Sequence, residues 1–432
     1  CRLRQLILAE ELLDKDYTPE TVVEIMGATK ADDNVIVSNQ IDFAYKLLDT
    51  DSDETEIPTI LELTFNDNED VNKRQIDFAQ ELIKKGLNKN IRNFYRILKG
   101  TNSTVSQINE HQLNFAKELF NKRVEEITIA STLSKTNSAN EEINLNQINL
   151  TRKLLDNKVG SYTIGTILGA TTAGDDVEYN QNYATFVENI LDKKPDNDYI
   201  DLLADILKHN RKFDAVKQLL DFVNDDNAKM QTNKIKLLKR LVSIYGNQPE
   251  LNQVLESIKS DDKEIEKQQI NFADQLTQKN IEPEETLQIL TNLKFDNKDM
   301  YWNKVALLGN FFQFEGDYCF ILPALQAVSS DDETTEFENI QFAKKIAAHS
   351  PAHVSKVLNA TKSSNPVVSA RQFELAQKLF ENENITSSGM SNILKATNST
   401  NNELNLSQIN LLNQLLDNFE FDTIPYKTNQ AI

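Results

Sequence analysis

The sequence repeats itself at intervals of about 35 residues, and this period constrains the fold more than any other feature. The phrase QIDFAYKLLD begins at Gln40, and close copies begin at Gln75, Gln112 and Gln147. We call the residue at this position the anchor of its repeat. Twelve anchors follow one another: Gln5, Gln40, Gln75, Gln112, Gln147, Tyr183, Lys234, Gln269, Lys304, Asn339, Gln372 and Gln408. Ten of the eleven intervals lie between 33 and 37 residues, and the interval from 183 to 234 is 51. Such a period is typical of stacked repeats.

Within each repeat the apolar residues follow helical spacing and do not alternate. After the anchor Gln40, the residues Ile41, Phe43 and Leu47 fall on one helical face, and the second burst IPTILELT from Ile57 gives another. Thr18 before a proline is a typical helix start. The connecting stretches are rich in Asn, Asp, Ser and Thr, while Gly (11) and Pro (9) are scarce. Each repeat is therefore predicted to be a helix A, a short loop, a helix B and a polar connector.

A single helical hairpin cannot bury its own apolar faces, so the hairpins are expected to stack on one another. The predicted fold is all-α, a right-handed α-solenoid of about twelve two-helix repeats. In architecture the hairpins resemble the HEAT, armadillo and tetratricopeptide classes over nearly the whole chain. The Trp, Gly, Tyr and Ala pattern of tetratricopeptide repeats is absent from QIDFAYKLLDTDSDETEIPTILELT. The period also resembles that of the pentatricopeptide class, which implies RNA recognition, but members of that class are typically basic.

The long interval divides the chain into three parts. We expect one helical array over residues 1–207, an irregular insert or hinge over 208–233, and a second array over 234–432, continuous with the first. An extra helix is predicted from Phe213 to Val223. Cations gather around this insert: Lys208, Arg211, Lys212, Lys217, Lys234, Lys236, Lys239 and Arg240. They form a solvated face, a docking patch for an acidic partner, or pairs with the acidic connectors of the chain itself.

The anchor glutamine lies on or beside the apolar stripe of helix A, and a buried amide must be hydrogen-bonded. We predict a structural ladder in which each glutamine bonds the connector or helix end of the neighbouring repeat. The alternative is a polar row that contacts a ligand. The ladder residues are Gln40, Gln75, Gln112, Gln147, Gln269, Gln372 and Gln408. The threonines that end helix B are expected to complete the ladder: Thr29, Thr64, Thr101, Thr136, Thr361 and Thr397.

The repeat around Lys304 departs most from the pattern, because its sequence MYWNKVALLGNFFQFEGDYCFILP is rich in aromatic residues. We expect these side chains to crowd together. Aromatic residues dominate binding hot spots, and they also fill cores. The predicted partner-binding residues are Trp302, Phe311, Phe312, Phe314 and Tyr318, with Phe320 beside them.

Composition disfavours some partners and favours one compartment. The net charge is −20, which disfavours nucleic acid and anionic membranes. The two cysteines, Cys1 and Cys319, form no disulfide framework. With no visible signal peptide or apolar span, this favours the cytoplasm. Because the sequence starts inside a helix A and ends without a full helix B, we also expect that it can be a fragment of a longer protein.

Catalytic and metal-binding patterns are absent from the sequence. It contains no GxxxxGK[ST], GxSxG or HExxH motif. The acidic stretch DTDSDETE from Asp49 lacks the glycine and the final glutamate of a calcium loop. We therefore predict no enzyme activity, no cofactor and no metal. The expected function is a protein- or peptide-binding scaffold. The alternatives are a self-assembling repeat subunit and a nucleic-acid-binding solenoid.

Overall fold

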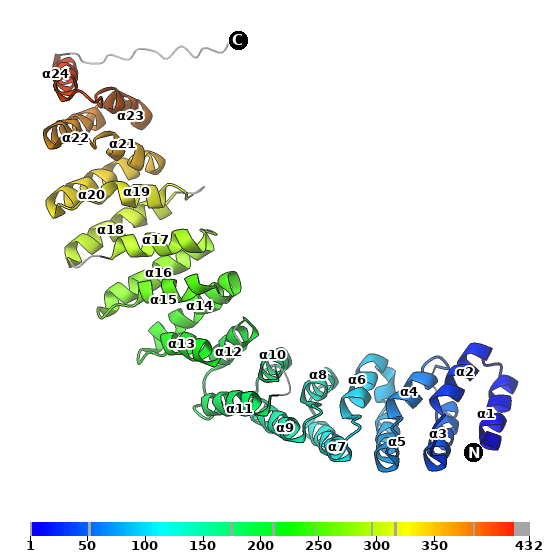
Figure 1. Cartoon of the computed structure of the whole chain (residues 1–432). Coiled ribbons are helices and arrows are strands. Elements are labelled where there is room, and N and C mark those ends of the chain that lie inside the picture. The colour runs from blue at the N-terminus through cyan, green and yellow to red at the C-terminus, as the bar shows by residue number, and fades with distance from the viewer. Residues whose placement is uncertain are drawn as a thin grey trace, which may run out of the picture. The chain divides into compact units, whose positions relative to one another are not determined.

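A computed structural model describes residues 2–50, 53–172, 176–209, 212–246, 248–294, 297–314, 318–382 and 385–418. In these ranges the chain forms 24 α-helices, two short 3-10 helices and no strand (Figure 1). The all-α prediction is confirmed, with a helical-repeat architecture. Cys1 and Arg211, both considered in the sequence, lie outside the described residues.

Each anchor lies inside a long helix, which is helix A of its repeat. Helices A are α1 (Arg2–Asp14), α3 (Asn34–Leu48), α5 (Glu69–Lys84), α7 (Ser106–Asn121), α9 (Glu141–Asp156), α11 (Val177–Leu191), α14 (Ala228–Tyr245), α16 (Lys263–Gln278), α18 (Lys298–Phe312), α20 (Glu333–Ala347), α22 (Pro366–Glu381) and α24 (Asn402–Asn418).

The helices that follow them in the chain are shorter and form the second row. Helices B are α2 (Pro19–Ala28), α4 (Ile57–Thr64), α6 (Ile91–Thr101), α8 (Glu126–Thr136), α10 (Ser161–Thr171), α12 (Asn197–His209), α15 (Pro249–Ile258), α17 (Pro283–Leu293), α19 (Ile321–Val328), α21 (Val354–Ala360) and α23 (Ser387–Ala396). The 3-10 helices η1 (Leu87–Lys89) and η2 (Pro351–His353) precede α6 and α21. The extra helix α13 (Phe213–Val223) has the predicted bounds.

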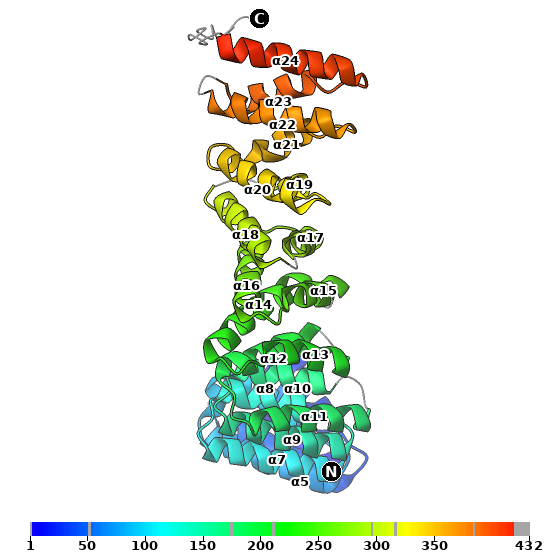
Figure 2. The same cartoon turned by 90° about the vertical axis from the view of Figure 1, so that its left-hand side faces the viewer.

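The chain divides into two compact units, residues 1–224 and residues 225–432. In unit 1 the A helices α3, α5, α7, α9 and α11 pack in succession, and so do the B helices from α2 to α12. In unit 2, α14 packs on α16, α18 on α20 and α22 on α24, while the B helices from α15 to α23 form one continuous row. Figure 2 shows these layers of unit 2 following one another from α14 to α24.

The polar connectors are rich in Asn and Asp because they cap the A helices. The Asp33 carboxylate accepts hydrogen bonds from the backbone N–H groups of Val35 and Ile36 at the start of α3. Asn140 does the same at the start of α9, and Asn297 at the start of α18. Such a cap satisfies donors that the first helical turn leaves without a partner.

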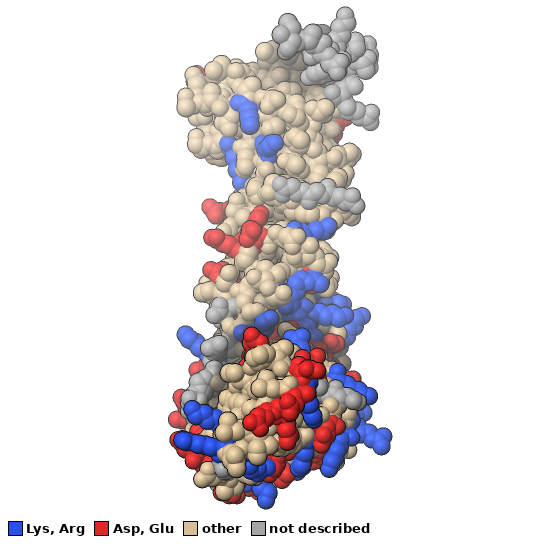
Figure 3. Space-filling view, turned by 90° about the vertical axis from the view of Figure 1, so that its right-hand side faces the viewer, with Lys and Arg blue, Asp and Glu red and all other residues tan. Residues whose placement is uncertain are grey.

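The apolar positions of the repeat form the core, as their spacing predicts. In α3 the residues Ile41, Phe43, Ala44 and Leu47 are each at most 1% exposed. Among the described residues, no helix is long and apolar enough to cross a bilayer. On the face of unit 1 that Figure 3 shows, acidic and basic side chains are intermixed.

Candidate functional site

The anchor glutamines bond the last turn of helix B in their own hairpin. The Gln112 amide donates to the Thr136 hydroxyl at 2.9 Å, and the Gln147 amide donates to the Thr171 hydroxyl at the same distance. The Thr101 hydroxyl donates to the Gln75 carbonyl oxygen at 3.1 Å. The Gln372 amide reaches the carbonyl and hydroxyl oxygens of Thr397, and the Gln5 amide reaches the Thr29 carbonyl. These contacts fix helix B against helix A within one repeat.

A second row of polar side chains, mostly asparagine amides three residues before the anchors, bonds the preceding repeat. The Asn109 side chain donates to the Thr101 carbonyl, and the Asn144 side chain to the Thr136 carbonyl, at 2.9 and 2.7 Å. Asn72, Asn180 and Ser369 make the equivalent bond to Thr64, Thr171 and Thr361. The threonines that end helix B therefore join the hydrogen bonds within a repeat to those between repeats. We call this chain of contacts the polar ladder.

The predicted ladder partner was wrong in one respect. The glutamines were expected to reach the neighbouring repeat, but the antiparallel hairpin brings the last turn of their own helix B beside them. Gln40 and Gln269 are equally buried, and their amide atoms have no partner among the described residues. Gln269 lacks one because Leu293 stands at the threonine position. Gln408 is half-buried, and the residue at its threonine position lies outside the described residues.

Removing one threonine hydroxyl of the polar ladder tests its structural role. Thr136→Val is expected to lower the free energy of unfolding by about 1–3 kcal/mol, because the Gln112 amide stays buried without its partner. The measurement is the urea midpoint of the full chain. Thr64→Val is the matched control, since the Thr64 hydroxyl donates only to carbonyls of its own helix among the described residues. Equal losses for the two variants would refute the ladder.

In unit 2, buried ion pairs occupy some of the positions that form the polar ladder elsewhere. Lys304 stands at an anchor position, and its ammonium lies 2.6 Å from the carboxylate of Glu336, three residues before the next anchor. Lys234 and Glu266 occupy the same two positions in an earlier pair of repeats, at 2.8 Å. All four side chains are at most 5% exposed. A cation at the glutamine position is thus matched by an anion at the asparagine position of the next helix A.

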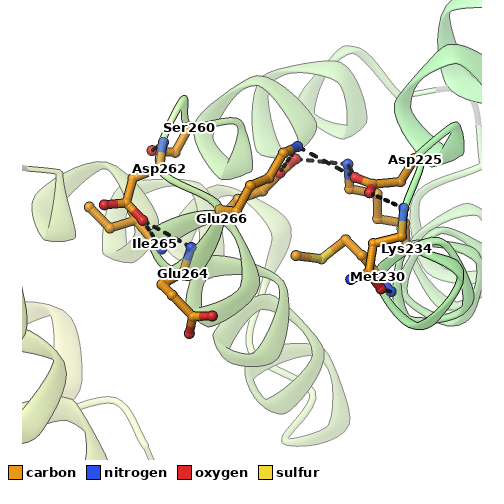
Figure 4. A network of polar contacts seen from close by, with 10 residues as sticks. Asp225, Met230, Lys234, Ser260, Asp262, Glu264, Ile265 and Glu266 are labelled. Atoms are coloured by element: carbon orange, nitrogen blue, oxygen red, sulfur yellow. Dashed lines mark hydrogen bonds and ion pairs between the residues drawn. The ribbon is translucent and has the colours of Figure 1, made fainter.

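The pair around Lys234 belongs to a larger network, shown in Figure 4. The Lys234 ammonium also lies 2.9 Å from the Asp225 carboxylate, which accepts a hydrogen bond from the Asn227 backbone N–H. Lys263 lies 2.8 Å from Glu266 and 3.5 Å from Asp225. Burial disfavours ionisation of Asp225, but the Asn227 N–H and the Lys234 ammonium outweigh it and hold the pKa of Asp225 below its usual value. The hydrogen bond to Glu266 raises the pKa of Lys263.

These shifts make the contribution of the network depend on pH. A carboxyl group whose pKa is depressed by folding stabilises the fold above its unfolded pKa of about 3.9 and loses that contribution as the pH falls further. Asp225→Asn is therefore expected to lower the thermal midpoint of unit 2 at neutral pH, and the difference from wild type should shrink below about pH 4. Circular dichroism melts across this range measure it. A difference that stays constant down to pH 3 would contradict the assignment.

The cationic run of the insert does not form one patch of free charges. Lys234 is buried in the network, and Arg240 lies 2.6 Å from the Asp274 carboxylate. Both cations therefore pair with acidic groups of this chain. Lys208, Lys212 and Lys217 on unit 1 and Lys236 on unit 2 are exposed.

The predicted aromatic cluster assembles without Trp302. Phe311 and Tyr318 are buried, and the ring of Phe320 contacts both. Phe312 packs against Tyr318 and against Phe272 of α16, and Phe314 is half-buried. Trp302 contacts the ring of Tyr301 and lies ten residues before Phe312 on α18, roughly 15 Å along the helix axis. The sequence missed this separation because the two groups lie at opposite ends of one helix.

A groove of about 1020 Å³ lies between α20 and α22 on unit 2. The rings of Phe342 and Phe373 meet edge to face at its floor, with centroids 5.4 Å apart. Phe337 stands on the α20 wall and is 43% exposed, and Ala370 stands on the α22 wall. Hydroxyl groups of the two connectors line the groove near the starts of the helices: Ser329, Ser330, Ser363 and Ser364.

An aromatic contact between the two helices distinguishes this repeat. The residue after the anchor is aliphatic in most repeats, as in Ile41, Ile76 and Ile340, but it is Phe373 in α22. Its ring packs edge to face against that of Phe342 on α20. The repeat is also shortened, since only 33 residues separate the anchors Asn339 and Gln372.

The groove carries both signs of charge. Asp331, Glu338 and Glu374 line it together with Lys345 and Lys362. Glu374 is paired with Arg371 at 2.8 Å. Burial lowers the pKa of Lys362, although the carboxylate of Glu336 opposes this shift. Among the described residues, no basic side chain forms an ion pair with Glu338, which is exposed.

An apolar row crosses the A helices beside the groove, two residues before each anchor. It consists of Trp302 on α18, Phe337 on α20, Ala370 on α22 and Leu406 on α24, none of which is fully buried. The same position is polar in most other repeats, as in Ser38, Lys73, Glu110, Gln181, Thr232 and Lys267. Sequence reasoning missed this row, although aligning the repeats on their anchors would have shown it.

A second, smaller hollow of about 610 Å³ lies on unit 1 beside the extra helix α13. Its walls are the rings of Tyr179, Tyr183, Phe186 and Phe213, which pack against one another at centroid distances of 4.5–5.4 Å. Burial raises the pKa of Tyr183, which replaces the anchor glutamine. The groove between α20 and α22 is larger and has exposed Phe337 on its wall, so it is the stronger candidate site.

Among the described residues, no group of three or more His, Cys, Asp and Glu side chains is placed to hold a metal ion. The sequence matches no family model, and neither a curated protein nor a solved structure matches it.

Proposed function

We propose that the chain is a non-catalytic scaffold that binds an extended segment of a partner protein. In this proposal it is a right-handed α-solenoid of about twelve two-helix repeats. The observation that carries the proposal is the groove between α20 and α22, with exposed Phe337 on its wall and the apolar row beside it. Its volume of about 1020 Å³ is at the upper end for ligand sites, about 300–1,000 Å³.

Two features support an extended polypeptide as the ligand. The groove combines aromatic rings with hydroxyl, amide and charged groups, which suits a backbone with mixed side chains. The polar ladder holds successive hairpins in register, so a partner meets a surface that is already ordered. A preformed surface lowers the entropy cost of binding.

Selection of randomised peptides displayed on phage, against the full chain, tests the proposal. The expected result is enrichment of peptides that bind the wild-type chain and lose binding to Ala370→Trp, which fills the groove. The fold is expected to tolerate this change, because Ala370 is exposed and Trp302 occupies the equivalent position of α18.

Gln181→Trp is the matched control, because it adds the same side chain at the same repeat position of α11, at a residue that does not line the groove. It should bind the enriched peptides as the wild type does. Failure to enrich any peptide, or enrichment that Ala370→Trp leaves unchanged, would refute the proposed function.

A further inference from the structure

The spacing of the apolar row matches one peptide conformation. Neighbouring packed helices lie about 8–10 Å apart, so Trp302 on α18 and Phe337 on α20, at equivalent positions, repeat at about that distance. A polyproline II helix has three residues per turn and rises about 3.1 Å per residue, so every third side chain returns to the same face after about 9.3 Å. In a fully extended strand, side chains return to one face after about 7 Å, which is shorter than the spacing of the apolar row.

The chemistry of the row fits proline. Proline-rich segments dock between aromatic side chains and need little ordering, because their conformation is fixed before binding. Phe337 is exposed and Trp302 is half-buried on the adjacent helix, while the small Ala370 leaves the space beyond Phe337 open. The row thus offers two aromatic ridges followed by a groove whose floor is formed by Phe342 and Phe373.

The charge on the α20 wall of the groove favours a basic residue in the bound peptide. Glu338 follows Phe337 directly, is exposed and has no ion-pair partner among the described residues. Lys345 lies two turns further along α20, and Lys362 lies in the connector before α22. A cationic side chain of the peptide is therefore favoured beside Phe337. The net charge of −20 also favours a basic partner at long range.

We propose that the apolar row and the groove bind a proline-rich segment in the polyproline II conformation, with a basic residue next to Glu338. This inference rests on the proposed function and specifies its ligand. The row sets the proline period, and Glu338 sets the position of the cation.

Binding of synthetic labelled peptides to the full chain, followed by fluorescence anisotropy, tests the inference. The first peptide has proline at every third position and one arginine. The second replaces each proline by alanine, and the third replaces the arginine by glutamine. The first peptide should bind at least about tenfold more tightly than the second, a difference of about 1.4 kcal/mol. It should bind about two- to fivefold more tightly than the third, the range of an exposed ion pair.

Three variants locate the contact. Ala370→Trp and Phe337→Ser should each weaken binding of the first peptide about tenfold or more. Glu338→Gln should remove the preference for arginine, and Gln181→Trp should change nothing. Because Phe337 and Ala370 are both exposed, their variants should keep the helical circular dichroism and melting midpoint of the wild type.

The outcomes separate this inference from the proposed function. Phage selection could yield peptides whose binding Ala370→Trp abolishes, while the alanine peptide binds as well as the proline peptide. In that case the scaffold function stands and the polyproline inference is wrong. If no peptide binds, both are wrong.

Discussion

Lys304→Met is expected to destabilise unit 2 by about 3–5 kcal/mol, because it leaves a buried carboxylate without its counter-charge. Glu336 is 2% exposed and lies 2.6 Å from the Lys304 ammonium. The Lys304 ammonium also donates to the Asn292 carbonyl at the end of α17. Urea unfolding followed by circular dichroism measures the loss. We expect the midpoint of unit 2 to fall while that of unit 1 is retained.

A double substitution tests the reason for this loss. The pair Lys304→Met and Glu336→Leu removes both charges and is expected to recover most of the lost stability, since apolar side chains of similar volume leave no buried charge. A single variant that loses less than about 1 kcal/mol, or a double variant as unstable as the single one, would contradict the pairing.

Gly100→Ala is expected to cost unit 1 about 1–3 kcal/mol through overpacking between α6 and α8. A Cβ atom at residue 100 would lie 2.7 Å from the Cβ of Leu133 and 3.0 Å from its backbone carbonyl carbon. Backbone atoms cannot move aside as the end of a flexible side chain can. The two helices would have to separate, and the thermal midpoint of unit 1 measures the effect.

Gly165→Ala, on α10 of the same row of B helices, is the matched control. A Cβ there would meet only the Ser131 hydroxyl, at an ordinary 3.5 Å. Alanine is favoured over glycine inside a helix by about 1 kcal/mol, so this variant should be as stable as the wild type or more stable. If both variants behaved alike, the close approach of α6 and α8 would not be a determinant of packing.

The positions of the helices could be predicted from sequence because the same apolar pattern recurs from repeat to repeat. Each anchor lies inside a helix A, and the extra helix begins at Phe213 as expected. Apolar residues at fixed offsets show which face of a helix must be buried, and Asn or Asp before most A helices marks their start. Both signals are local in the chain, and local signals are the most reliable ones.

The partners of buried polar groups were harder to predict. The sequence shows that Gln112 lies beside an apolar stripe, but not whether its amide reaches its own hairpin or the next. The partner of the amide depends on which turns of the two helices lie beside each other. The asparagine row at Asn109 and Asn144 was missed, although it recurs at the same offset as the glutamines. Lys304 and Glu336 were missed as a pair because they lie in different repeats.

The groove could not have been predicted from periodicity. It lies where one repeat departs from the pattern, at the contact between Phe373 and Phe342. The aromatic residues that attracted attention in the sequence, Phe311 and Tyr318, are instead mostly buried within unit 2.

The measurement that tests the central claim most directly is hydrogen–deuterium exchange of the full chain, with and without a peptide enriched against it. We predict slower exchange of backbone amides in α18, α20 and α22 and in the connectors at Ser330 and Ser363, with unit 1 unchanged. Protection confined to unit 1, or none at a saturating peptide concentration, would contradict the assignment of the groove as the binding site.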